Sequence, residues 1–327
     1  MNRLLPNRSL SLVPALFVAL AIGCGGQNRA AESAIVVFNA GALALPLRQA
    51  LDSFARQGTL QVSQENAGSV ETVRKILDLH RIPDVLGLAD TALFSRFLGG
   101  RISGGVTVLG STRMVLAYTP RSRFAAEVSA QNWADVTTRP GVQVGRSDPS
   151  LDPAGYRALM AMQLAEKYYG HRGLASRLER AAPAANMRPK SADLIALLQT
   201  GNLDYAWEYE SVARRLGLRF VALPPEVDLG DPALAGIYAT AKVEIPDPGS
   251  SADGVTRDPR PVPQLMIGAP IVFGAAVPTD ASHPETGRRF ITYLMSQEGR
   301  AIFASYGLVA KLPVSGAPRS KHGGQGR

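Results

Sequence analysis

The segment AIVVFNAGALALPLRQALDSFARQ, residues 34–57, contains one complete strand–turn–helix unit. It opens with an apolar run rich in β-branched side chains, which is typical of a buried strand. A turn of small residues around Gly41 follows, and apolar residues then recur at helical spacing over residues 45–57. The segment therefore predicts a strand that leads directly into a helix.

The same unit recurs along the chain, with apolar runs alternating with helical patterns. This alternation favours an α/β fold in which mainly parallel sheets are flanked by helices. The further predicted strands are 60–65, 84–90, 141–145, 203–210, 218–224 and 270–278, and the further predicted helices are 69–80, 91–100, 152–170, 191–201 and two closing helices over the region of Phe290 to Tyr306.

A long extended stretch at 106–120 divides this series in two, because it can pass from one sheet to another. The strand at 270–278 follows a loop rich in proline and glycine at 246–263. We therefore predict two α/β lobes joined by two crossings. The predicted first lobe comprises residues 34–115 and 268–313, and the predicted second lobe comprises residues 116–267.

The N-terminus has the pattern of an export signal. Residues 1–23 combine basic residues with an apolar run that is shorter than the roughly 20 residues needed to span a bilayer. The run ends at Cys24, the only cysteine, in a context that resembles a bacterial lipobox. We expect a lipid anchor on Cys24, a tether at 24–33 and a disordered basic tail at 314–327, on the extracytoplasmic face of the cell membrane. Plain secretion with another cleavage site is the alternative.

Charge and composition narrow the class of function. The net charge is +8, but no basic stripe interleaved with aromatic residues accompanies it, so we expect no nucleic-acid partner. A positive field also suits a small anion. The four histidines lie far apart in the sequence, and the chain has neither a Gly-x-Ser-x-Gly elbow nor a Walker loop. We therefore expect no enzyme, with an exported enzyme built from distant histidines as the less favoured alternative.

Four strand-to-helix turns share small or hydroxyl residues, at 39–43, 66–72, 150–157 and 188–194. Ser69, Asp152 and Ser191 are predicted N-caps, and Pro153 takes the favoured first helical position. In open α/β sheets, ligands bind beyond the carboxyl ends of the strands, where helix N-termini point. Free N–H groups at such turns can hold a compact oxyanion. The alternative is that each residue only caps its own helix.

Several long segments, in order along residues 34–313, resemble the tungstate/molybdate-binding proteins of ABC importers. The resemblance implies a two-lobed periplasmic-binding-protein fold of type II, which takes up a tetrahedral oxyanion between its lobes and passes it to a membrane permease. It also implies a monomer that needs no cofactor besides the tungstate or molybdate ligand. The segments are FNAGAL, ENAGSVETVRKI, PDVLGLAD, the run from QNWADV to AEKYYG, RPKSADLIALLQTGNLDYAWEYESVA, LPPEVDLGDP and GAPIVFGAAVP.

The resemblance also implies a set of ligand contacts. Asp152 can approach the metal of the oxyanion itself, because hard, high-valent metals accept carboxylate oxygen. Carried over by position, the oxyanion contacts are Gly41, Ala42, Ser69, Asp152, Pro153, Ala154, Ser191 and Tyr209.

The chain departs from the family pattern at two of these positions. Ala42 replaces a serine, and Ser191 stands where some relatives place a second coordinating glutamate, so four-fold and six-fold coordination both stay open. Glu208 could replace that second acid, but it alternates with Tyr209 along an extended strand and is expected to point to the other face, so it is a minor candidate and a structural pairing is favoured. Taken without the resemblance, Tyr209 is interpreted as an aromatic residue of the core. Arg157 is expected to make a structural salt bridge or hydrogen bonds.

Other ligands stay open at this point. Sulfate and phosphate are also tetrahedral oxyanions, and the proton of phosphate suits an acceptor such as Asp152. A sensor without a permease is a further alternative. The residues do not rank tungstate against molybdate.

Overall fold

The computed structural model describes residues 33–56, 60–249 and 263–309. Residues 1–32 and 310–327 lie outside the described part, and so do the predicted signal peptide, the lipid-attachment residue Cys24 and the predicted tail. Among the described helices, none combines the length and the apolar character needed to cross a membrane.

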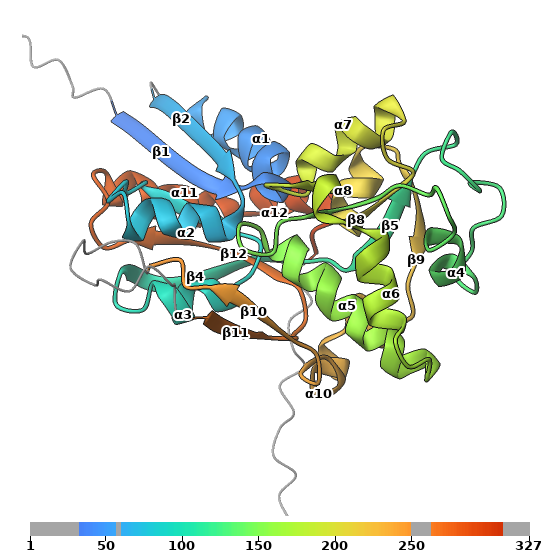
Figure 1. The fold of residues 1–327 in the computed structure, drawn as a ribbon. Coiled ribbons are helices and arrows are strands. Elements are labelled where there is room, and N and C mark those ends of the chain that lie inside the picture. The colour runs from blue at the N-terminus through green and yellow to red at the C-terminus, as the bar shows by residue number, and fades with distance from the viewer. Residues whose placement is uncertain (1–32, 57–59, 250–262, 310–327) are drawn as a thin grey trace, which may run out of the picture. The chain divides into compact units, whose positions relative to one another are not determined.

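The first of two five-stranded sheets has the order β2-β1-β3-β12-β4 (Figure 1). β1 is parallel to β2 and to β3, whereas β12 is antiparallel to β3 and to β4. Its strands are β1 (Ser33–Ala40), β2 (Leu60–Ala67), β3 (Val85–Leu88), β4 (Ile102–Ser111) and β12 (Val272–Pro278).

Helices connect the strands of this sheet and follow its last strand. The turn after β1 is a short 3-10 helix, η1 (Gly41–Leu43), which leads into the first α-helix. The α-helices are α1 (Ala44–Ala55), α2 (Ser69–Leu77), α3 (Ala92–Phe97), α11 (Pro284–Leu294) and α12 (Gln297–Ser305). We call this sheet with its helices the first lobe.

The second sheet has the order β7-β6-β8-β5-β9. β6 is parallel to β7 and β8, and β5 is antiparallel to β8 and β9. In each sheet four of the five strands run in one direction, and only β12 in the first sheet and β5 in the second run against them, so both sheets are mainly parallel, as the sequence predicts. The strands are β5 (Met114–Tyr118), β6 (Val144–Ser147), β7 (Met187–Arg188), β8 (Tyr205–Tyr209) and β9 (Arg219–Ala222).

The helices that accompany this sheet complete the second lobe. The longest, α5 (Pro153–Tyr169), begins after β6 and carries the Asp152 cap at its start. The others are α4 (Trp133–Thr137), α6 (Leu174–Ala181), η2 (Ala184–Asn186), α7 (Ala192–Thr200), α8 (Glu210–Arg215), α9 (Pro225–Asp228), η3 (Pro232–Leu234) and α10 (Ala235–Tyr238).

The chain passes between the sheets where the sequence analysis places a crossing. The single extended stretch predicted at 106–120 is interrupted at residues 112–113. Before the interruption the chain forms β4 of the first sheet, and after it the chain forms β5 of the second sheet. The predicted loop at 246–263 is flanked by an antiparallel pair, β10 (Lys242–Pro246) and β11 (Pro263–Ile267), which the sequence analysis missed. The chain then returns to the first sheet as β12, between β3 and β4.

Buried strands anchor both lobes. All four residues of β3 and all five of β8 are buried, as expected for central strands covered on both faces. In the second lobe, Trp133 and Trp207 pack edge to face with ring centroids 5.8 Å apart. This packing fixes β8, whose carboxyl end carries Glu208 and Tyr209.

Candidate functional site

The dipeptide Leu151–Asp152 connects the N-termini of three helices. The carbonyl oxygen of Leu151 accepts hydrogen bonds from the N–H groups of Val70 and Glu71 in the first turn of α2, at 3.0 and 3.1 Å. The Asp152 carboxylate caps α5 and also accepts the N–H of Ser191 at the start of α7. Helix starts from both lobes therefore meet at this dipeptide, where their positive ends favour negative charge.

Asp152 is a buried carboxylate with two backbone donors. Its Oδ1 accepts the N–H of Ala154 at 3.4 Å, and its Oδ2 accepts the N–H of Ser191 at 2.8 Å. Burial raises the pKa of Asp152 to about 6, although these two N–H groups and the nearby Ser147 hydroxyl lower it. Asp152 is thus an N-cap as predicted, and it is also bound to a second helix. Its role toward a ligand stays a prediction.

Glu208 lies close enough to Asp152 for the two charges to interact. Its side chain is fully buried, and its Oε1 accepts the N–H of Tyr209 at 2.7 Å. Burial raises the pKa of Glu208 to about 8, against lowering by the Tyr209 N–H and the nearby Ser191 hydroxyl, and the Asp152 charge adds to the rise. The Tyr209 N–H is a structural partner of the kind expected for Glu208. The side chain also lies near Asp152 and Ser191, which strand alternation does not predict, and its role toward a ligand stays a prediction.

Three buried polar atoms near this carboxyl pair have no hydrogen-bond partner among the described residues. They are Oγ of Ser147, the hydroxyl of Tyr209 and Oε2 of Glu208. Tyr209 is fully buried at the end of β8, and its ring packs edge to face on Phe273 of the first lobe. Burial raises its pKa well above the usual value, and the nearby Asp152 charge contributes. Because buried polar groups are rarely left unpaired, this cluster indicates a site for a polar ligand.

The predicted serine caps differ from what the sequence suggests. Gly68, and not Ser69, is the N-cap residue of α2, and the Ser69 hydroxyl oxygen instead accepts the N–H of Ala89 at 3.0 Å. Ser191 is the N-cap residue of α7 but makes no side-chain capping bond. Both serines are buried, so their hydroxyl protons can be donated only inside the molecule. Pro153 occupies the first turn of α5 as predicted.

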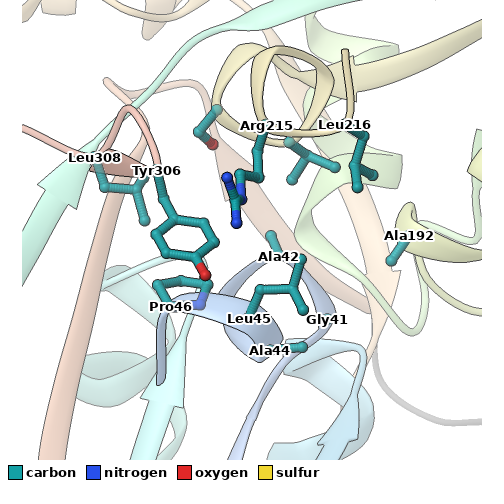
Figure 2. Close-up of a pocket in the computed structure, with 12 residues that line it drawn as sticks. Gly41, Ala42, Ala44, Leu45, Pro46, Ala192, Arg215, Leu216, Tyr306 and Leu308 are labelled. Carbon is teal, nitrogen blue, oxygen red and sulfur yellow. The ribbon is translucent and has the colours of Figure 1, made fainter. Parts of the chain in front are cut away.

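Gly41 and Ala42 lie beside the start of α7. A Cβ atom added to Gly41 would lie 3.2 Å from Cδ of Lys190 and 3.5 Å from Cβ of Ala192. Both residues line a mostly apolar cavity of about 140 Å³. Figure 2 shows this cavity, with Arg215 and Tyr306 drawn across from Ala42. The structure thus brings Gly41 and Ala42 next to the loop of Ser191, on the opposite lobe.

A buried ion pair crosses between the lobes beside the site. Asp90, which follows β3, accepts 2.7 Å hydrogen bonds from the Tyr156 hydroxyl and from Nη2 of Arg157, both in the first turn of α5. Nη1 of Arg157 donates to the carbonyl of Ala269. The salt bridge expected for Arg157 is confirmed. It places one buried positive charge near a cluster that is otherwise acidic.

The chemistry of this arrangement is that of binding. Hydroxyl groups and helix N-termini supply donors, and two buried carboxyls supply either donors, when protonated, or oxygen ligands, when ionised. Within the described residues, no group of three or more His, Cys, Asp and Glu side chains is placed to hold a bare metal ion. An oxyanion brings its own oxygens and needs fewer protein ligands.

Comparisons with known proteins decide the family. Residues 35–309 match the family described as bacterial extracellular solute-binding proteins. This chain belongs to that family. A solute-binding protein of Petrotoga mobilis is 37% identical over 286 residues, covering 86% of this chain and 85% of that protein. The membership places this solute-binding protein outside the cytoplasm.

Two archaeal relatives carry a name that states a ligand. The molybdate/tungstate-binding protein WtpA of Thermococcus kodakarensis is 30% identical over 322 residues, covering 89% of this chain and 87% of that protein. WtpA of Pyrococcus abyssi is 29% identical, with 90% of each chain covered.

Solved structures agree on the fold of this solute-binding protein. The periplasmic molybdate-binding protein of Azotobacter vinelandii superposes with a TM-score of 0.56 at 16% identity, covering 85% of this chain and 99% of that one. The sulfate-binding protein SubI of Mycobacterium tuberculosis gives a TM-score of 0.59 at 13% identity, covering 86% and 88%. These likenesses confirm the predicted two-lobed fold of type II.

Proposed function

We propose that this solute-binding protein captures tungstate or molybdate between its lobes and delivers it to the permease of an ABC importer. The names of its relatives in Thermococcus and Pyrococcus support this ligand class. The observation that carries the proposal is the buried cluster of Asp152, Glu208, Ser147 and Tyr209 at the meeting of helix N-termini.

Donors in this cluster suit the oxygens of a tetrahedral dianion. The hydroxyl of Tyr209 has no partner within the described part of the chain, and Ser69 can donate its proton while its oxygen accepts the Ala89 N–H. Hydrogen bonds to a charged group contribute about 1.5–3 kcal/mol each. Gly41, Ala42, Pro153, Ala154 and Ser191 complete the proposed contacts through small residues that let an anion approach the backbone.

The two carboxyls favour a metal oxyanion over sulfate. A sulfate dianion offers neither a proton nor an open coordination position, so an ionised carboxylate beside it is only repulsive. Tungsten and molybdenum are hard, high-valent centres that accept carboxylate oxygen. Asp152 and Glu208 can each supply one such oxygen, and Glu208 takes the place of the second acid that the sequence analysis looked for at Ser191.

The protein acts as a monomeric binding protein with no catalytic site and no resident cofactor, and the oxyanion is its cargo. Cys24 carries a lipid that anchors the chain to the outer face of the cell membrane. The anchor is tested by replacing Cys24 with Ser: the protein should leave the membrane fraction, whereas continued anchoring would exclude the lipobox.

Isothermal titration calorimetry tests the ligand. Purified protein is titrated with tungstate, molybdate, sulfate and phosphate under identical conditions. Stoichiometric binding of the first two, with much weaker binding of sulfate, is expected. Tight binding of sulfate or phosphate with no heat from tungstate and molybdate would overturn the assignment and favour the other oxyanions.

A further inference from the structure

The two lobes touch through backbone atoms directly beside the site. The carbonyl oxygen of Leu151, in the second lobe, accepts the N–H groups of Val70 and Glu71, in the first lobe. These are amides from the first turn of α2, which have no partner inside their own helix. The residue after this carbonyl is Asp152. Contact between the lobes and the position of Asp152 are therefore linked through one peptide.

Gly68 makes this approach possible. A Cβ atom at Gly68 would lie 2.8 Å from the carbonyl carbon of Leu151, closer still to its oxygen, and 3.3 Å from Cα of Asp152. The backbone of Gly68 has φ −66° and ψ 148°, a conformation that any residue adopts. Glycine is therefore needed here for space between the lobes and not for its conformational freedom.

The start of α5, which follows Leu151 and Asp152, is also bound to the first lobe through a second contact. Tyr156 and Arg157 both donate to Asp90, each at 2.7 Å. The start of α5 is thus held on two sides, by α2 through Leu151 and by the residue after β3 through Asp90. Asp152 lies between these two attachments in the sequence.

We propose that Gly68 is a positioning residue for ligand capture: its missing side chain lets Leu151 dock on α2, and this backbone contact holds the lobes closed around the bound oxyanion. The inference rests on the proposed function for its ligand, but the contact itself does not depend on that ligand. Moving the lobes apart at this point breaks both hydrogen bonds, so loss of the contact lowers the closed fraction and raises the apparent Kd in inverse proportion to that fraction.

The test replaces Gly68 with Ala in the full chain. Gly236 in α10 is the matched control, because, apart from its chain neighbours and its own helix backbone, no atom of the described residues lies within 4 Å of a Cβ placed there. Tungstate binding is measured by stopped-flow kinetics and calorimetry for the unchanged chain, Gly68→Ala and Gly236→Ala. We expect Gly68→Ala to weaken binding by roughly tenfold or more, mainly through faster dissociation, since the barrier to reopening is lost. Gly236→Ala should bind as the unchanged chain does.

A readout without ligand separates this inference from the proposed function. Hydrogen exchange at the amides of Val70 and Glu71 should be slow in the unchanged chain and in Gly236→Ala, and faster in Gly68→Ala, while protection elsewhere in α2 persists. General destabilisation would instead speed exchange throughout the helix. The inference would be overturned if the amides of Val70 and Glu71 exchanged as slowly in Gly68→Ala as in the unchanged chain and tungstate also dissociated from both proteins at the same rate. Failure of the unchanged chain to bind tungstate would overturn the proposed ligand, and the exchange data would still decide the role of Gly68.

Discussion

The backbone N–H of Ser191 donates a 2.8 Å hydrogen bond to Oδ2 of Asp152. This bond joins the start of α7 to the start of α5, so the carboxylate that caps one helix also accepts from a second. A group held in this way has a fixed direction, and Asp152 is therefore preorganised beside Glu208 and Tyr209.

Replacing Asp152 with Asn separates its two roles. Asn caps a helix about as well as Asp, but its single acceptor oxygen can keep only one of the two bonds from Ala154 and Ser191. The fold should stay intact with a loss of about 1–3 kcal/mol in stability for the buried N–H that loses its acceptor. If the carboxylate contacts the metal of the oxyanion, tungstate affinity should fall by roughly ten- to a hundredfold, in line with about 1.5–3 kcal/mol for a contact with a charged group. Calorimetry measures this fall. Asp193→Asn, at a partly exposed acid in the first turn of α7, is the control, and equal affinities for both variants would reduce Asp152 to a cap.

Glu208 should make the ligand-free protein less stable as the pH rises. The folded state holds a proton on Glu208 up to a pKa of about 8, whereas the unfolded chain loses it near 4.5. The stabilisation is complete below pH 4.5 and is lost as the pH passes 8, with a slope of about 1.4 kcal/mol per pH unit between these values. Asp152 also lowers the free energy of unfolding as the pH rises, between its unfolded pKa of 3.8 and its folded pKa of about 6.

Glu208→Gln isolates this contribution. Urea unfolding at pH 6, 7 and 8 should give a smaller loss of unfolding free energy with pH for Glu208→Gln than for the unchanged chain. Between pH 6 and 8 the Asp152 contribution has ended, so the difference in slope belongs to Glu208. Parallel slopes for the two proteins in this interval would show that Glu208 does not hold its proton in the fold.

Tyr209→Phe should leave the fold intact and weaken binding. The hydroxyl has no partner among the described residues, so its removal costs no internal hydrogen bond and relieves the burial of a polar group. Tungstate affinity should nevertheless fall by roughly tenfold or more if this hydroxyl donates to the oxyanion. Tyr205→Phe is the control in the same strand. Its hydroxyl donates to the Arg123 carbonyl at 2.6 Å, so its loss should lower the melting temperature and spare affinity. If Tyr209→Phe kept its tungstate affinity and Tyr205→Phe lost it, Tyr209 would not be a ligand contact.

Breaking the ion pair of Arg157 and Asp90 should be costly. Both side chains are buried, and Arg157→Met leaves the Asp90 carboxylate without its counter-charge. A loss of about 3–5 kcal/mol in unfolding free energy is expected, measured by chemical denaturation. Adding Asp90→Asn to Arg157→Met should recover part of this loss, because the uncompensated buried charge is then gone. A double variant as unstable as the sum of the single variants would show that the two groups do not act as a pair.

Much of the architecture can be read from the sequence because its signals are local. Apolar runs followed by helical spacing identify β1 with α1 and β2 with α2, and the extended stretch at 106–120 identifies a crossing. The local patterns do not specify which strand pairs with which. The antiparallel insertion of β12 between β3 and β4 depends on contacts between residues nearly two hundred positions apart, and no local pattern encodes them.

For the candidate site, too, local sequence patterns predict some features and not others. Asp152 and Pro153 have a recognisable capping signature, and the structure has this cap. Strand alternation ranks Glu208 below Tyr209 because it places the two on opposite faces, but β8 ends at Tyr209 and the chain turns into α8 there. The signal that favours Glu208 is an acidic residue inside a strand whose other members are all apolar or aromatic, since a buried acid needs a reason. Ser69 is mistaken for a cap because Gly68, with no side chain, holds that position.

The place of β12 in the first sheet has a consequence for biogenesis. A polypeptide that stops short of residue 278 lacks the strand that joins β3 to β4, so its N-terminal half carries two incomplete sheet fragments with open edges. The second sheet, drawn entirely from residues 114–222, needs no such late addition. The first sheet therefore stays incomplete until nearly all of the described chain has been made, whereas the second sheet can form well before that.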